Sequence, residues 1–359
     1  MINGHGGNIF DLAQKLGCTP SDIIDMSSNV NPLGPPPNLL NFLVKKISSL
    51  TALPEVEARK AISAFAGRYS VDPKLVLAGN GTTQFIYSLP LALGTENALI
   101  MGPTYADYED ACKMHNISYN CFILKEQAGF KPDMHLAEQS IKKADTVFIC
   151  NPNNPTGVLI PAEELNILCK SHPNTSFVID ESYLPFVTDG GRHSMINSEL
   201  SNVIVLNSMS KIFRIPGLRI GFIKSSEKII EKLAGYSLPW SVNSLAQAAV
   251  VYLMEHKSET DAFIDNTRKF LDAERRRFAD MLENAPGIKL FPSTTSFMLA
   301  ELTGNHRADE ICYALSCDKI LIRNCANFKG LSDRFIRISL KTQEINTMVA
   351  EKILKFHKS

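Results

Sequence analysis

The sequence predicts an α/β protein whose larger part is built on a mostly parallel sheet with helices on both faces. Apolar, strand-like runs recur between residues 75 and 225, and helix-like segments separate them. The runs lack polar alternation, which is typical of strands buried on both faces. Polar motifs follow nearly every run, as expected where ligands bind at the carboxyl ends of parallel strands. The predicted strands span residues 75–78, 98–101, 146–150, 176–179, 202–206 and 218–223.

Beyond residue 244 the pattern changes and predicts a second, smaller domain. An amphipathic helical pattern covers 244–284, and the charged triplet 275–277 within it is expected to form a solvated helix face. Shorter mixed elements follow, with strands expected at 296–300, 320–322 and 335–340 and a closing helix at 342–356. We expect an N-terminal arm over 1–45 that packs with the small domain, a large domain over 46–255 and a small domain over 256–359.

Composition indicates a soluble enzyme with two domains rather than a protein that binds nucleic acid or membrane. The chain has 359 residues, and its 37 Lys and Arg balance its 37 Asp and Glu. This balance gives no basic surplus for nucleic acid. No apolar run approaches the about 20 residues that span a bilayer, and the start lacks the pattern of a signal peptide. We therefore expect a cytoplasmic location.

The eight cysteines are scattered and form no CxxC pair, which favours reduced, buried thiols. Cys312, Cys317 and Cys325 are the one group close enough in sequence to suggest a metal site. Their spacings match no zinc pattern, so we interpret them as packing residues and expect no metal.

The most informative motif surrounds Lys211, which follows an apolar run and lies among small hydroxyl residues. The hydroxyls of Ser208 and Ser210, with the guanidinium of Arg219, would hold a phosphate beside the lysine amine. Arginine suits this task because its planar fork pairs with two phosphate oxygens. An amine beside an anchored phosphate is what a pyridoxal phosphate enzyme needs for its covalent link to the cofactor. The alternative is a solvated basic loop.

A glycine-rich turn that includes Gly81 and Thr82 precedes a predicted helix at 84–93. Backbone amides at a helix N-terminus bind phosphate, helped by the positive end of the helix dipole. The alternative is a plain capped turn. No Gly-Lys-Ser/Thr follows, so the turn is not a Walker loop.

Four polar or aromatic residues follow other predicted strands and would serve the cofactor ring. Asp180 would bond the pyridine nitrogen and keep it protonated, a charge-assisted bond of about 1.5–3 kcal/mol. Tyr183 and Asn154 would hydrogen-bond the phenolic oxygen, and Tyr105 would stack on the ring. The structural alternatives are a cap for Asp180, core aromatics for the tyrosines and a turn residue for Asn154.

Two arginines and a histidine are candidates for substrate binding. Arg337 lies in the apolar run 335–340, where a charge is rarely buried without a partner. A substrate carboxylate or phosphate is a suitable partner, and an internal salt bridge is the alternative. Arg323 follows 320–322 and has the same two interpretations. His5 is bracketed by glycines that allow close approach to a ligand, unless the terminus is mobile.

Together the segments 151–157, 180–183 and 208–221 resemble the fold type I pyridoxal-phosphate-dependent aminotransferases of class I and II, in order and interval, over nearly the whole chain. Within that family, the opening His5-Gly6-Gly7-Asn8 and the segments 29–34 and 321–328 resemble the L-threonine-phosphate decarboxylases of cobalamin biosynthesis more than the histidinol-phosphate aminotransferases.

The resemblance implies a mostly parallel sheet of seven-stranded type in the large domain, a smaller α+β domain, pyridoxal 5′-phosphate as cofactor, and a homodimer with its site near the interface. It also implies residue roles. Lys211 would carry the Schiff base, with Asp180 and Tyr183 as its catalytic partners. The phosphate would be held by Gly81, Thr82, Ser208, Ser210 and Arg219. The substrate, a small phosphorylated amino acid, would be bound by His5, Asn31, Asn154, Arg323 and Arg337.

One segment departs from the family's pattern. Many relatives have a Tyr-Pro-Asp segment whose tyrosine reaches the neighbouring subunit's cofactor, and the matching stretch here is Leu53-Pro54-Glu55. The resemblance therefore does not extend to this cross-subunit hydrogen bond.

The expected reaction is decarboxylation of L-threonine phosphate to (R)-1-aminopropan-2-yl phosphate. The bond that breaks is the one held perpendicular to the cofactor ring, and a phosphate gripped by Arg337, Arg323 and His5 would turn the carboxylate into that position. Transamination of histidinol phosphate is the alternative. A non-catalytic pyridoxal-phosphate-binding regulator is an alternative of another class. A nicotinamide-binding fold is disfavoured because no GxGxxG follows the first predicted strand.

Overall fold

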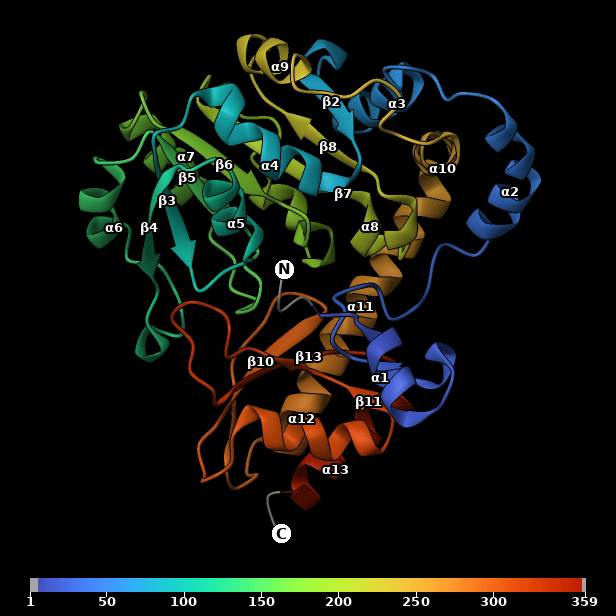
Figure 1. Cartoon of the computed structure of the whole chain (residues 1–359), viewed down its shortest axis with the longest axis vertical. Coiled ribbons are helices and arrows are strands. Elements are labelled where there is room, and N and C mark those ends of the chain that lie inside the picture. The colour runs from blue at the N-terminus through green and yellow to red at the C-terminus, as the bar shows by residue number, and fades with distance from the viewer. Residues whose placement is uncertain (1–5, 357–359) are drawn as a thin grey trace.

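The computed structural model describes residues 6–356, which fold into a larger and a smaller part (Figure 1). The larger part contains a seven-stranded sheet in the order β2-β8-β7-β6-β5-β3-β4. Only β8 runs antiparallel to its neighbours, so the sheet is mostly parallel, as predicted. Its strands are β2 (Val76–Gly79), β3 (Asn97–Gly102), β4 (Ser118–Ile123), β5 (Thr146–Cys150), β6 (Ser176–Asp180), β7 (Val203–Ser208) and β8 (Gly221–Lys224).

Edge strand β4 was not predicted, because its exposed and half-buried residues lack the continuous apolar run of the central strands. The last predicted strand was placed three residues early, since Leu218 belongs to a short 3-10 helix. Helices flank the sheet (Figure 1), and their apolar stripes complete the core. The helices of the larger part are α2 (Leu39–Lys45), α3 (Arg59–Tyr69), α4 (Gly81–Leu93), α5 (Asp107–Met114), α6 (Met134–Ile141), α7 (Ala162–Ser171), α8 (Met209–Ile212), α9 (Glu227–Ala234) and α10 (Ser244–Glu255).

The smaller part contains an antiparallel sheet in the order β12-β13-β10-β9. It also includes part of the N-terminal arm, because β1 pairs in parallel with β11. The elements are α1 (Ile9–Leu16), β1 (Ile24–Asp25), β9 (Ile288–Leu290), β10 (Phe297–Leu302), α12 (Ala308–Cys317), β11 (Ile320–Leu321), β12 (Arg323–Asn324), β13 (Phe335–Ser339) and α13 (Gln343–Phe356). The 3-10 helices of the chain are η1 (Pro20–Asp22), η2 (Ile47–Thr51), η3 (Pro73–Leu75), η4 (Glu126–Ala128), η5 (Leu184–Phe186), η6 (Gly190–His193) and η7 (Pro216–Leu218).

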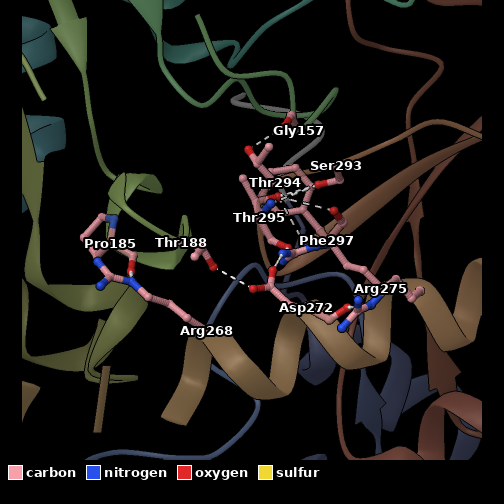
Figure 2. A network of polar contacts seen from close by, with 11 residues as sticks. Gly157, Pro185, Thr188, Arg268, Asp272, Arg275, Ser293, Thr294, Thr295 and Phe297 are labelled. Carbon is pink, nitrogen blue, oxygen red and sulfur yellow. Dashed lines mark hydrogen bonds and ion pairs between the residues drawn. The ribbon is translucent and has the colours of Figure 1, made fainter. Parts of the chain in front are cut away.

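One long helix, α11 (Lys257–Leu282), contacts both parts through side-chain bonds (Figure 2). Thr188 of the larger part donates to the Asp272 carboxylate over 2.6 Å. Asp272 in turn forms an ion pair with Arg275, whose guanidinium donates to the Thr295 carbonyl of the smaller part over 2.7 Å. A parallel contact joins the Arg268 guanidinium to the Pro185 carbonyl over 2.9 Å. Helix α11 therefore links the larger and the smaller part through side-chain hydrogen bonds.

This network corrects the expectation that the triplet 275–277 is a solvated face. Arg275 is largely buried against Thr295. Arg277 bonds Glu274 and the carbonyl of Gln343. The amphipathic pattern does not show that loops pack across residues 275–277. From the sequence alone we therefore expect these side chains to face solvent.

We expect Asp272→Asn to lower the free energy of unfolding by about 1–2 kcal/mol, because it weakens hydrogen bonds to a charged group that is partly screened by solvent. Asp280→Asn on the same helix is the matched control, since Asp280 is exposed. Denaturant unfolding of both variants measures the difference. Equal stability of the two variants would contradict the role given to this network.

Candidate active site

The predicted site residues converge at the carboxyl ends of the parallel strands, where they line two adjoining cavities. The smaller cavity, about 80 Å³, contains the predicted phosphate-binding and ring-binding residues together with Lys211. The larger cavity, about 790 Å³, contains Arg323 and Arg337. Both are lined by Tyr105, Asn154, Tyr183 and Lys211. A ligand in the smaller cavity would therefore contact residues that also face the larger one.

Asp180 is the last residue of β6 and is almost completely buried. One carboxylate oxygen accepts hydrogen bonds from the amide of Ser182 over 2.9 Å and from its hydroxyl over 2.5 Å. The other accepts from the Tyr108 hydroxyl over 2.9 Å. Burial raises the pKa of Asp180, and these three donors act in the opposite direction. A cation placed beside Asp180 would further favour the carboxylate.

Lys211 lies on the short helix α8, directly after β7. Burial lowers its pKa to about 8, and the neighbouring Arg219 and Arg337 act in the same direction. Among the described residues, the Lys211 amine has no hydrogen-bond partner, so it remains available to a ligand. The backbone of Lys211 is held in place because its carbonyl accepts from the amide of Asn31 over 3.0 Å.

The predicted phosphate-binding residues form a cradle in which backbone segments approach closely. Gly81 has a φ of +71°, and a Cβ there would lie 2.8 Å from the Arg219 guanidinium. A Cβ on Gly221 would lie 2.5 Å from the amide nitrogen of Thr82. Glycine is therefore required at both positions. The first turn of α4 and the hydroxyls of Ser208 and Ser210 line the same cavity, so amide and hydroxyl donors and a guanidinium face one space.

Tyr183 belongs to a hydrogen-bonded chain that reaches the smaller part. Its hydroxyl accepts from the Asn29 side-chain amide over 3.2 Å, and the Ser339 hydroxyl donates to Asn29 over 2.7 Å. Burial raises the pKa of Tyr183, so its hydroxyl stays protonated. Tyr105 packs edge-on against Tyr108, with 5.9 Å between ring centroids. Asn29 and Tyr108 thus belong to the site although the sequence analysis assigned them no role.

Arg337 is only 4% exposed. Its guanidinium donates to the side-chain oxygen of Asn154 and, over 2.6 Å, to the carbonyl of Ser27. It also lies 5.3 Å from the centroid of the Phe297 ring. The Nε atom is buried with no hydrogen-bond partner, and no carboxylate of residues 6–356 forms an ion pair with Arg337. The internal salt bridge considered from the sequence is therefore absent from the described part of the chain.

Arg323 is the cross-strand neighbour of Arg337, because β12 and β13 place the two residues directly opposite each other. Opposed residues of an antiparallel pair face the same side of a sheet, and like charges there repel. The Arg323 guanidinium donates to the carbonyl of Asn324 and to Asn327, and lies 5.2 Å from the centroid of the Phe328 ring. Two guanidinium groups therefore line one wall of the larger cavity.

Asn31 is not brought to either cavity. Its side-chain amide donates to the carbonyl of Ile212 and the hydroxyl of Thr267, each over 2.8 Å. Asn31 thus anchors the N-terminal arm to the lysine helix, and Asn29 lines the larger cavity instead. His5 lies outside the described residues. The following Gly6 lines the larger cavity, and a Cβ there would lie 2.5 Å from the Ser27 carbonyl.

Two other features of the described chain bear on function. Within residues 6–356, no group of three or more His, Cys, Asp or Glu side chains is arranged to hold a metal ion. No helix of that part has both the length and the apolar character to cross a membrane.

Comparison with known proteins relates this geometry to one family. The family described as aminotransferase class I and II matches residues 21–353. The adenosylcobalamin biosynthesis bifunctional protein CobDQ of Leptospira interrogans is 34% identical over 352 residues, which are 97% of this chain and 40% of that protein. The chain therefore spans less than half the length of that relative.

Solved structures with two different activities resemble this fold equally. Histidinol-phosphate aminotransferase from Clostridium acetobutylicum has a TM-score of 0.85 and 28% identity, over 94% of this chain and 99% of its own. L-threonine-O-3-phosphate decarboxylase from Porphyromonas gingivalis has a TM-score of 0.84 and 29% identity, over 94% of this chain and 100% of its own. Overall fold therefore does not distinguish the two reactions.

The lowered pKa of Lys211 predicts a reactive amine near neutral pH. In protein freed of any bound cofactor, labelling of Lys211 by an acylating reagent, quantified by peptide mass spectrometry, should reach half its maximal rate near pH 8. An unperturbed lysine would do so at about pH 10.4. Arg219→Met should raise the midpoint, because it removes a neighbouring cation that disfavours protonation. A wild-type midpoint above pH 10 would contradict this account.

Proposed function

Because this chain belongs to the aminotransferase class I and II family, whose members are pyridoxal 5′-phosphate enzymes, we propose that it decarboxylates L-threonine phosphate to (R)-1-aminopropan-2-yl phosphate. The observation that carries this proposal is the pair Arg323 and Arg337, opposed across two strands and facing the larger cavity. Two guanidinium groups on one wall suit the oxygens of a phosphate.

The residues of the smaller cavity fit the cofactor. The cradle of glycines, hydroxyls and Arg219 suits its phosphate, and a Cβ on Gly81 would obstruct that cradle. Lys211 offers a free amine for covalent attachment, and Asp180 is placed to hold a proton at the ring nitrogen. Tyr183 and Asn154 would donate to the phenolic oxygen. When bound, pyridoxal phosphate supplies an electron sink for a bond broken at the substrate's α carbon.

Charge in the larger cavity favours a substrate with more than one negative group. Among the described residues lining it, five are cationic and one is a carboxylate, Asp25. The cations are Lys211, Arg214, Arg323, Arg337 and Lys341. A phosphate carries about −1.5 to −2 at pH 7, and a carboxylate adds one more charge. A phosphorylated amino acid therefore balances this cavity better than a neutral one.

The position of the arginine pair is compatible with decarboxylation of an amino acid that is bound by its phosphate. When Arg337 and Arg323 hold the phosphate, Arg337 is not available as a clamp for the α-carboxylate. The substrate can then turn about its α carbon, and binding energy at the phosphate sets which bond stands perpendicular to the ring. Histidinol phosphate has no carboxylate to lose, so the same grip on its phosphate would serve transamination.

We also propose that the chain forms a homodimer through an apolar surface formed by residues 40–53. Large apolar side chains are exposed on α2 and η2 and just beyond them, which is unusual for a monomer surface. They are Leu40, Val44, Ile47, Leu50 and Leu53. Leu53, which replaces the family's tyrosine, is 75% exposed. An apolar residue there suits a packing contact with a second copy.

The product formed from L-threonine phosphate tests the proposed reaction. We expect stoichiometric release of carbon dioxide with no requirement for an oxo-acid acceptor. Arg323→Met should lower kcat/KM at least about tenfold, the scale of one charge-assisted hydrogen bond, and should raise the ratio of amino transfer to decarboxylation. Arg323→Lys should restore part of the lost kcat/KM and part of the preference for decarboxylation. Amino transfer from histidinol phosphate to oxoglutarate, without gas release from threonine phosphate, would overturn the proposal.

Val44→Glu places a charge in the apolar surface of α2 and should shift a dimer toward monomer in sedimentation velocity experiments. Lys355→Glu, at an exposed position of α13, is the control for an added negative charge. A wild-type protein that sediments as a monomer at micromolar concentration would contradict the dimer.

A further inference from the structure

The larger cavity contains a buried cation, Lys341, that belongs neither to the arginine pair nor to the proposed cofactor site. Lys341 lines this cavity and is 8% exposed. Within the described part of the chain, its ammonium forms no hydrogen bond and no ion pair. A buried cation without such a partner is unfavourable unless a ligand or water supplies one.

The backbone of Lys341 is anchored just beyond the end of β13. Arg337 and Ser339 share one face of β13, and Lys341 follows two residues after the strand ends. The buried side chain of Asn346 accepts from the amide of Lys341 over 2.8 Å and donates to its carbonyl over 2.9 Å. These two hydrogen bonds fix the backbone of Lys341, whose side chain lines the larger cavity.

Different charged groups act on Lys341 and on Lys211. Arg337 acts directly on the pKa of Lys211, whereas the charges that act on Lys341 are Asp25 and Arg214. One oxygen of Asp25 already accepts three hydrogen bonds from Ser27 and Ser28. Burial lowers the pKa of Lys341 to about 8, so the side chain is charged in most molecules at pH 7.

We propose that Lys341, with Arg214 on the same cavity lining, forms a second anion subsite that binds the phosphate group of the substrate before that group reaches Arg323 and Arg337. This role rests on the proposed function, because it assigns the subsite to a phosphorylated amino acid. Cations along a cavity attract an anionic ligand and raise its rate of association. Free inorganic phosphate has the same chemistry and would compete for the subsite.

The test compares the holoenzyme of wild type, Lys341→Met and Lys341→Arg. Methionine keeps the length of the side chain without its charge, and its burial is not expected to destabilise the fold. Lys355→Met, at an exposed position of α13, is the control. Inorganic phosphate binding is measured by titration calorimetry, and kcat and KM for threonine phosphate are measured at low and high salt.

We expect Lys341→Met to weaken phosphate binding about tenfold and to lower kcat/KM by a similar factor at low salt, with kcat within about twofold. Lys341→Arg should retain both the phosphate binding and the kcat/KM of the wild type. Weaker phosphate binding with unchanged kcat/KM would overturn the capture role and assign the subsite to free phosphate. Unchanged phosphate binding would overturn the subsite itself. The calorimetric result does not depend on which reaction the enzyme catalyses, so failure of the proposed function leaves it interpretable.

Discussion

The site depends on the buried positive charge of Arg337, which has no counter-ion among the described residues. Arg337 lies in β13, held by Asn154 and the Ser27 carbonyl, while its Nε atom has no partner. Burying an unpaired charge costs several kcal/mol. The same strands place Arg323 directly opposite. A bound anion would relieve both the desolvation of Arg337 and the repulsion between the two arginines, so the small domain is built to favour a negatively charged ligand.

That charge also affects the Lys211 amine. Arg337 and Arg219 both act to lower the pKa of Lys211, and each lines a cavity proposed to take a phosphate. An anion at either position would screen its arginine and raise the pKa of the lysine again. Ligand binding and the protonation state of Lys211 are therefore linked through ordinary electrostatics. The links between Asn31 and the lysine helix and between α11 and both parts hold these groups at fixed positions.

The sequence predicted the sheet and the location of the site because both follow local rules. Continuous apolar runs identify central strands, and strand ends bring Asp180, Ser208 and Asn154 together whatever the details of packing. Contacts between distant segments were not predictable in this way. Asn29, rather than Asn31, reaches the cavity because of where the arm crosses β13. Tyr108 reaches Asp180 from α5, more than 70 residues earlier in the chain. Lys341 follows Arg337 closely in the sequence, but no local feature of the sequence shows that its side chain lacks a partner.

If the grip on the phosphate decides which bond at the α carbon breaks, deuterium tracing identifies that bond. When the reaction with L-threonine phosphate is run in D₂O, we expect an amine product that keeps its original α hydrogen and gains one deuterium in place of the carboxylate. Mass spectrometry and proton NMR distinguish the two positions. Loss of the original α hydrogen to solvent, with the carboxylate retained, would show that the C–H bond breaks instead and would overturn the proposed role of the phosphate grip.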